Sequence, residues 1–359
     1  MQKMLRYGIT TGTCAAAAAK AAVLTLLSGP VDKVVVPSPL GLRIEVPVKE
    51  CKIISDHTVT ASVIKDAGDD ADVTDGLEIF ATVSLSEDDK IVIKGGKGIG
   101  IVTKPGLPVP LGEPAINTTP RRMIKEAIKE VLPPNKGAEV VISIPESGKV
   151  SKKTFNKKLG IIDGISVLGT TGIVKPFSIE AYKSSLVSQI DIAIAKEYKR
   201  IILVPGNIGE KLARKLLNVP NDGIVQTGDF IGFMLKKAVE KGLKEIMLFG
   251  HPGKLVKVAA GIFNTHHKSG DARKEVIAAY AGASGADAAT IQTILQSNTT
   301  EEMIEILKHK KLLHVTFNKI AEQISQRSME RIENKAEINT ILVALDGTVV
   351  GSDGKAEAN

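Results

Sequence analysis

The sequence predicts an α/β protein, with an N-terminal α+β domain (residues 1–158) followed by a Rossmann-like, parallel-sheet α/β domain with a helical C-terminal region (residues 159–359). Two observations predict this organisation. The chain has 359 residues, which is more than one ordinary hydrophobic core supports. From about residue 160, short apolar runs begin to alternate with helical segments, which is the pattern of βαβ units.

The N-terminal domain is expected to begin with a helix over an alanine-rich run that follows Thr10, Thr11 and Thr13. The threonines offer an N-cap, and Ala15 to Ala19 have no bulk to keep another element or a flat ligand at a distance. Runs rich in β-branched residues then predict strands, and a helix follows Pro120. The expected strands are 33–38, 42–48, 61–66, 77–85, 89–96 and 139–145, and the second helix is 120–132.

The C-terminal domain is expected to hold four strands of a parallel sheet, each followed by a helix or turn. These strands are 164–169, 200–206, 223–228 and 245–250, and the helices between or after them are 178–198, 209–217, 229–242 and 254–263. Residues 270–336 read as mostly helical, and residues 339–351 as a closing strand or a hairpin around Asp346-Gly347.

Composition favours a cytoplasmic protein. The two cysteines, Cys14 and Cys51, form no CxxC pair, so neither a disulfide framework nor a zinc cluster is expected. The apolar run Ala15–Leu27 follows polar residues, contains Lys20 and is shorter than a spanning helix, so no membrane association is expected. The six histidines show no metal-binding pattern, and we expect no metal site there.

The net charge of +7 points to an anionic partner. Nucleic acid is disfavoured, because the lysines are scattered among acidic residues and the aromatic residues that would stack on bases make up only 3% of the chain. A polycarboxylate or phosphate ligand fits a modestly basic cleft. A homo-oligomer stays open.

Glycine-bearing turns follow all four strands expected in the C-terminal domain. In a parallel sheet the carboxyl ends of the strands line a crevice, so four such turns would surround one ligand with backbone N–H groups. The candidate cofactor-binding residues are Gly169, Thr170, Thr171, Gly172, Gly206, Asn207, Gly228, Asp229, Gly250 and Gly253. Each turn alone has an ordinary structural explanation, because tight turns need glycine and Asp229 could be only an N-cap. None matches GxGxxG or a Walker A loop.

Two side chains are candidate proton acceptors. His251 lies in the fourth turn, where a neutral imidazole can accept a proton near pH 7, or can simply hydrogen-bond the turn. Asp70 lies in the acidic loop KDAGDDADVTDG (residues 65–76), which we interpret mainly as a turn whose aspartates bond their own backbone. Cation binding by residues 66–75 stays open, although the spacing departs from an EF-hand.

The loop from Gly95 to Asn117 is long, glycine-rich and stiffened by Pro105, Pro108, Pro110 and Pro114. Loops of this length are more often functional than not. We therefore expect Lys104, Arg121 and Arg122 to meet an anionic ligand, although arginines at the start of an exposed helix are often only solvated.

Taken together, these motifs resemble the CbiD family of anaerobic cobalamin biosynthesis. The resembling stretches run from residue 10 to about 273 and are TTGTCAAAAAKAA, VIKDAGDDADVTDG, GGKGIGIVTKPGL, PAINTTPRRMI, KKTFNKKLGIIDGISVLGTTGIVKPFS, VPGNIG and GHPGKLVKVAAGIFNTHHKSGDAR. Two local departures from the family pattern are Ile9, where an aromatic residue is usual, and NTTPRRM in place of NPVPRRM.

The resemblance implies S-adenosylmethionine-dependent methylation of ring carbon 1 of a cobalt-containing tetrapyrrole, cobalt-precorrin-5B, to give cobalt-precorrin-6A. It carries no catalytic residue over to this chain. On our own reading, the glycine turns hold the methyl donor, with Asp229 on its ribose hydroxyls. Thr10, Thr11, Thr13, Lys104, Arg121 and Arg122 bind substrate carboxylates. The alternatives are a phosphate- or nucleotide-handling enzyme and a non-catalytic tetrapyrrole carrier.

Overall fold

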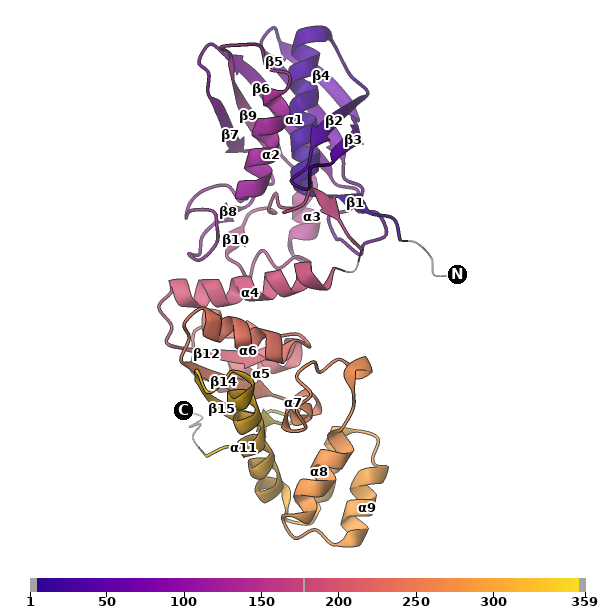
Figure 1. The fold of residues 1–359 in the computed structure, drawn as a ribbon, viewed down its shortest axis with the longest axis vertical. Helices are drawn as coiled ribbons and strands as arrows, with labels where there is room; N and C mark the ends of the chain where they lie inside the picture. Colours follow the sequence, from indigo (N-terminus) through magenta and orange to yellow (C-terminus); the bar gives the residue numbers. More distant parts are fainter. Residues whose placement is uncertain (1–4, 177, 355–359) are drawn as a thin grey trace. The chain divides into compact units, whose positions relative to one another are not determined.

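The structure is a computed structural model that describes residues 5–176 and 178–354. The chain divides into two compact units, Met1–Glu180 (unit 1) and Ala181–Asn359 (unit 2) (Figure 1). The division falls 22 residues after the expected boundary at residue 158. The α/β class predicted from the sequence is confirmed.

Unit 1 is built on a five-stranded sheet with the order β4-β5-β6-β9-β7, in which only the pairing of β7 with β9 is parallel. A separate hairpin pairs β2 with β3. The elements of unit 1 are β1 (Gly8–Ile9), α1 (Thr11–Ser28), β2 (Lys33–Pro37), β3 (Arg43–Pro47), β4 (Glu50–Ser55), β5 (Thr58–Ile64), β6 (Glu78–Ser86), β7 (Ile91–Gly95), β8 (Ile101–Val102), α2 (Thr118–Lys129), β9 (Gly137–Ser143), α3 (Gly148–Ser151), β10 (Ile161–Ile162) and β11 (Ile173–Val174).

The sheet of unit 1 has one apolar and one polar face, as the strand period of two requires. Ala61 pairs with Ala81, which pairs with Ile142, and all three are fully buried. On the opposite face the hydroxyls of Thr60 and Thr82 hydrogen-bond across the strands at 2.8 Å. The apolar face is the one that a helix must cover.

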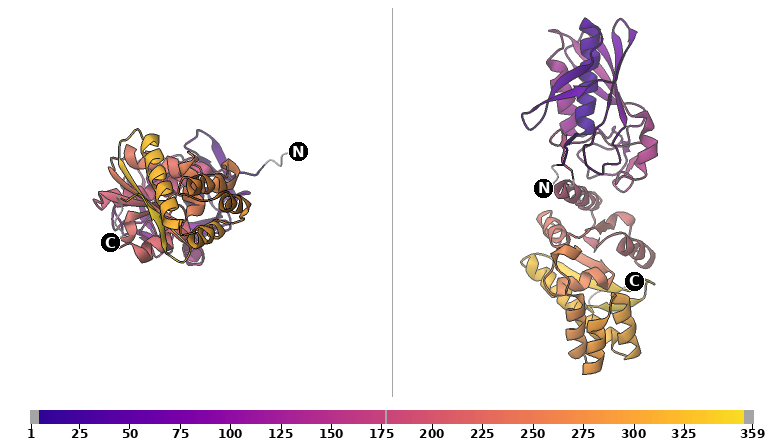
Figure 2. Two further views of the ribbon diagram at one scale, coloured as in Figure 1. Left: turned by 90° about the horizontal axis from the view of Figure 1, so that it is seen from below. Right: turned by 90° about the vertical axis from the view of Figure 1, so that its right-hand side faces the viewer.

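Helix α1 covers this face and packs against β5, β6 and α2 (Figure 2, where α1 is the indigo helix). Its alanines from Ala15 to Ala19 are completely buried, so the predicted close approach of this helix to its neighbours is confirmed. By length and composition α1 alone among the described helices could cross a membrane, but most of it is buried within unit 1, as in the core helix of a folded domain.

The long loops of unit 1 are joined into a small substructure. Strand β8 pairs with β10, and isolated bridges join Ile99 to Ile165 and Ile116 to Val167. The expectation that residues 164–169 form a strand of the parallel sheet is therefore wrong. Ile165 and Val167 are apolar because they fill the core of unit 1, where both are at most 1% exposed.

Unit 2 contains a five-stranded sheet with the order β13-β12-β14-β15-β16, parallel except for the last strand. Its elements confirm the strands and helices predicted from residue 178 onward, with shifted ends. They are α4 (Ile179–Ala195), β12 (Arg200–Val204), α5 (Asn207–Leu216), β13 (Ile224–Gln226), α6 (Ile231–Glu240), β14 (Glu245–Gly250), α7 (Pro252–Ala259), α8 (Arg273–Gly282), α9 (Ala288–Gln296), α10 (Thr300–His309), α11 (Leu313–Arg331), β15 (Glu337–Val343) and β16 (Val349–Ser352).

The complete burial of the alanines of α1 gives a stability prediction. Ala17→Leu should lower the free energy of unfolding by about 1–3 kcal/mol, because a fully buried site cannot take three further carbon atoms without displacing its neighbours. Urea denaturation measures the change. Leu27→Ala, at a position that is 46% exposed, is the control and should change stability by less than about 0.5 kcal/mol. Equal effects of the two substitutions would contradict the close packing.

Candidate functional site

The strand order of unit 2 predicts a crevice beside two particular strands. β12 leads through α5 to β13 on one side, whereas the chain returns through α6 to β14 on the other side of β12. Such a reversal of strand order opens a crevice at the carboxyl ends of the two central strands, here β12 and β14. The turns at that position are Pro205–Asn207 and Gly250–Gly253, both predicted from the sequence.

These two turns touch each other. A Cβ placed on Gly250 would lie 3.0 Å from Cδ of Pro205, which is tighter than an ordinary contact, so a side chain at position 250 would require a small shift of one turn. Gly206 adopts φ of +104°, a conformation that favours glycine. The glycines therefore bring two stretches of bare backbone together above the sheet.

Helix α5 begins at the crevice without a side-chain cap. Its N-cap is Gly206, and within residues 178–354 no hydrogen-bond acceptor is found for the backbone N–H groups of Asn207 and Ile208. The side chain of Asn207 accepts a hydrogen bond of 2.8 Å from Gln226 Nε2, which also donates to Glu210 at 2.6 Å. Gln226, at the end of β13, thus fixes the start of α5. The sequence analysis did not identify it.

Asp229 follows β13 and reaches the same crevice. Its Oδ1 lies 2.9 Å from Nζ of Lys254 and accepts a hydrogen bond of 3.2 Å from Thr265. Partial burial acts to raise the pKa of Asp229, but the hydrogen bond and charge of Lys254 together with the bond from Thr265 outweigh it, and the pKa lies below its ordinary value. Lys254 Nζ is also 3.8 Å from a Cβ placed on Gly206. Lys254 therefore pairs with the turn after β13 and ends close to the turn after β12.

Gly228 allows the ring of Tyr182 to pack against the turn after β13. A Cβ on Gly228 would lie 2.9 Å from the hydroxyl oxygen of Tyr182, and φ is +56°. Tyr182 packs edge to face against Phe230, with ring centroids 6.1 Å apart. This side of the turn is consequently bounded by aromatic rings.

His251 is the N-cap of α7. Its Nδ1 accepts a hydrogen bond of 3.1 Å from the Gly253 N–H, and its Nε2 lies 2.6 Å from Oε1 of Glu301. Because Nδ1 is an acceptor here, Nε2 carries the proton and donates to Glu301. Proton acceptance by His251 stays a prediction, and it would require Nδ1 to release Gly253.

The first of the four predicted turns, Gly169–Gly172, lies in unit 1 and not at the parallel sheet. It wraps around the start of α1, where the Thr10 N–H donates to Gly172 O at 3.1 Å and the Gly12 N–H donates to Leu168 O at 3.1 Å. The expectation that Gly169, Thr170, Thr171 and Gly172 share an edge with the other three turns is wrong. The physical reason is that the preceding apolar residues fill the core of unit 1.

All three threonines at the start of α1 have partners inside the protein. Thr10 caps the helix by accepting from the Thr13 N–H at 3.2 Å. Thr13 donates to Gly172 O at 2.5 Å, and Thr11 donates to Leu168 O at 3.1 Å. The predicted N-cap is confirmed. Binding of substrate carboxylates stays a prediction that would require Thr11 and Thr13 to give up these bonds.

The acidic loop is held by its own aspartates, as interpreted from the sequence. Asp66 accepts from the Gly68 N–H at 2.8 Å, Asp72 from the Thr74 N–H at 2.8 Å, and Asp75 from the Ala67 N–H at 2.7 Å. Lys65, whose side chain is 1% exposed, forms an ion pair with Asp72 at 2.7 Å. Asp70 is half-buried beside these residues, and its role as a proton acceptor stays a prediction.

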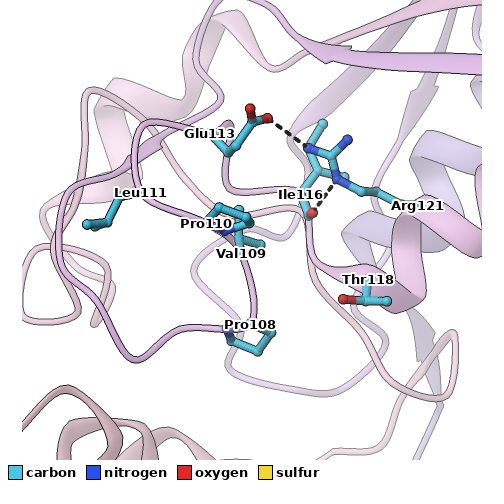
Figure 3. Close-up of a pocket in the computed structure, with 8 residues that line it drawn as sticks. All are labelled: Pro108, Val109, Pro110, Leu111, Glu113, Ile116, Thr118 and Arg121. Atoms are coloured by element: carbon cyan, nitrogen blue, oxygen red, sulfur yellow. Dashed lines mark hydrogen bonds and ion pairs between the residues drawn. The ribbon is translucent and has the colours of Figure 1, made fainter. Parts of the chain in front are cut away.

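The proline-rich loop of unit 1 borders a pocket of about 320 Å³ (Figure 3). Arg121 lies at its edge, where Nε donates to Ile116 O at 2.9 Å and Nη2 lies 3.8 Å from Glu113. Lys104 packs along Gly160 and donates to Lys158 O at 3.1 Å, and Arg122 lies 3.9 Å from Glu126 on the exposed side of α2. Among these predicted cations, Arg121 lines the pocket.

Sequence comparisons decide the family. The CbiD family model matches residues 1–176, and the model of the CbiD C-terminal domain matches residues 264–354. A protein of Methanocaldococcus jannaschii named cobalt-precorrin-5B C(1)-methyltransferase is 47% identical over 98% of this chain and 97% of its own. The chain belongs to the CbiD family. The predicted resemblance is confirmed.

Other CbiD relatives are similar along the whole chain. Proteins with the same name from Methanobrevibacter smithii and Moorella thermoacetica are 46% and 45% identical, over 96% and 98% of this chain and 96% of each relative. A crystal structure of the cobalamin biosynthesis protein CbiD from Archaeoglobus fulgidus is 33% identical, covers 76% of this chain and 84% of that chain, and has a TM-score of 0.41.

The position of Gly169 gives a prediction specific to unit 1. Gly169 and Gly112 both have positive φ, but a Cβ on Gly169 would lie 2.4 Å from Thr10, whereas a Cβ on Gly112 would meet nothing within 4 Å. Gly112→Ala should lower the free energy of unfolding by about 1 kcal/mol, and Gly169→Ala by about 3 kcal/mol. Chemical denaturation of both variants measures this difference, and similar losses would mean that the loop moves away from Thr10 at little cost.

The Lys65–Asp72 pair gives a prediction about pH. Burial acts to raise the pKa of Asp72, but hydrogen bonds from Lys65 and Thr74 outweigh it, so the folded-state pKa lies below the ordinary 3.8. The pair therefore stabilises unit 1 above about pH 4 and loses this contribution as the pH falls through the lower folded-state pKa. Asp72→Asn should cost about 2–3 kcal/mol at neutral pH and flatten the acid dependence of stability.

Urea titrations between pH 2 and pH 7 measure both effects of this substitution. Asp56→Asn, at an exposed position in the turn between β4 and β5, is the control and should change neither quantity. An unchanged acid profile in Asp72→Asn would show that the pair contributes nothing to stability.

Proposed function

We propose that this protein transfers a methyl group from S-adenosylmethionine to ring carbon 1 of cobalt-precorrin-5B, giving cobalt-precorrin-6A in anaerobic cobalamin biosynthesis. The observation that carries this proposal is the identity of 42–47% over nearly the full chain with relatives named cobalt-precorrin-5B C(1)-methyltransferase. A cytoplasmic location fits this biosynthetic role.

We assign the methyl donor to the three turns of unit 2, and we interpret this unit as Rossmann-like. Three observations support the assignment. The strand order reverses between β12 and β14. The glycines there leave the backbone uncovered by side chains. Asp229 has carboxylate oxygens that can accept hydrogen bonds from two ribose hydroxyls. Gly250 and Gly253 act through packing, because the Gly253 N–H is already bound by His251.

We assign carboxylate groups of the substrate to the basic loops of unit 1. The pocket beside Arg121 has the volume for one acetate or propionate arm and not for a whole macrocycle. Its prolines and leucine provide an apolar wall, and Arg121 provides a fixed charge. The net charge of +7 favours a substrate that carries many carboxylates.

Methyl transfer from a sulfonium requires little covalent assistance. The S–CH₃ bond breaks while the carbon of the macrocycle forms a bond to the methyl group, so the protein mainly has to position the two reactants and exclude water. A site made of rigid turns, rather than of strongly shifted catalytic groups, suits this chemistry.

Binding of the demethylated donor tests the assignment. Calorimetry should show saturable binding of S-adenosylhomocysteine and none of ATP, and Asp229→Asn should weaken the former at least tenfold, because its amide cannot accept two hydroxyl protons equally. Asp191→Asn is the matched control, since Asp191 forms a similar ion pair with Lys241 at 2.5 Å and is 34% exposed, compared with 28% for Asp229.

Two outcomes would contradict the proposal. Tight binding of ATP without binding of S-adenosylhomocysteine would favour a phosphate- or nucleotide-handling enzyme. Binding of the corrinoid without incorporation of labelled methyl, when donor and substrate are both supplied, would favour a tetrapyrrole carrier.

A further inference from the structure

Lys254 carries a charge beside the turns at the carboxyl ends of β12 and β14. It is the third residue of α7, and its side chain forms an ion pair with Asp229, which follows β13, and ends close to Gly206 at the start of α5. Lys254 is therefore near the turns after β12 and β13 as well as the turn after β14 from which it extends.

The Lys254–Asp229 pair is not needed to hold the fold together. The side chains are 41% and 28% exposed, and ion pairs at such positions contribute little to stability. Unit 2 already fixes its turns by packing of Pro205 against Gly250 and by the hydrogen bonds of Gln226. Two opposite charges beside bare backbone at a strand-order reversal are better explained by a ligand that carries matching groups.

The methyl donor of the proposed function has such groups in two of its parts. Its adenosine part is uncharged and offers two ribose hydroxyls as donors, which match a carboxylate. Its methionyl part carries a single carboxylate, which matches an ammonium group. The N–H groups of Asn207 and Ile208 at the start of α5 also match a carboxylate, because a helix N-terminus favours an anion.

We propose that Lys254 binds the methionyl carboxylate of the methyl donor, and that in the ligand-free protein its ammonium group rests on Asp229. This inference depends on the proposed function. Binding of the donor would break the Lys254–Asp229 ion pair. Lys254 would then contact the carboxylate, and Asp229 would accept hydrogen bonds from the ribose hydroxyls. Lys254 thereby distinguishes a donor with an intact amino acid from the bare nucleoside.

The experiment compares two ligands that differ in the amino-acid part. S-adenosylhomocysteine retains the methionyl carboxylate, whereas 5′-methylthioadenosine has the same nucleoside without it. Calorimetry on the full-length wild-type protein and on Lys254→Gln gives four dissociation constants. We expect Lys254→Gln to weaken S-adenosylhomocysteine at least tenfold and 5′-methylthioadenosine less than twofold, and Lys254→Arg to restore part of the loss.

Lys241→Gln is the matched control. Lys241 is the C-cap of α6, pairs with Asp191 at 2.5 Å and is 32% exposed. It should leave the affinity for both ligands unchanged. Thermal unfolding midpoints of all variants establish that they fold.

The outcomes separate this inference from the proposed function. Equal weakening of both ligands by Lys254→Gln, or no weakening of either, would overturn the role of Lys254 while leaving the donor site in place. Failure of the wild-type protein to bind either ligand would overturn the assignment of the donor site itself, and the inference with it.

Discussion

Close contact between two turns is the constraint on which the crevice of unit 2 depends. A Cβ on Gly250 would lie only 3.0 Å from Pro205, so the chain leaving β12 and the chain leaving β14 pass close to each other. This contact directs the start of α5 and the start of α7 toward one place. Asp229 then needs only a short excursion beyond β13 to reach Lys254. Backbone packing thus brings the turns of the candidate site together, and polar side chains are added to it.

The turns that contain glycine and threonine differ between the two units in how their backbone groups are hydrogen-bonded. In unit 2 the turns leave N–H groups of α5 without an acceptor among the described residues, which is what a ligand site requires. In unit 1 the carbonyl groups of Leu168 and Gly172 accept hydrogen bonds from the first turn of α1. These groups therefore stabilise the fold. Similar sequences, Gly-Thr-Thr-Gly and Pro-Gly-Asn-Ile-Gly, therefore lead to different chemistry.

Local patterns predicted most elements, because strand and helix periods are short-range properties. The apolar run 164–169 was wrongly assigned, since Ile165 and Val167 are equally buried whether they belong to a parallel sheet or to a core beneath long loops. Lys65 and Lys254 were missed for a related reason. A lysine in a strand or helix resembles any surface lysine until the fold shows what lies beside it, here Asp72 and Asp229. Asp229, by contrast, was found from its position after a strand.

The capping of α1 by residues 168–172 has a consequence for the order of folding. Thr11 and the carbonyl of Leu168 are 157 positions apart, so α1 leaves the ribosome long before the groups that satisfy its first turn. At roughly 5–20 residues per second, this delay is on the order of ten to thirty seconds. During that interval an alanine-rich helix long and apolar enough to span a bilayer has no complete burial site. The first turn of α1 therefore becomes fully hydrogen-bonded only after residues 168–172 have been synthesised.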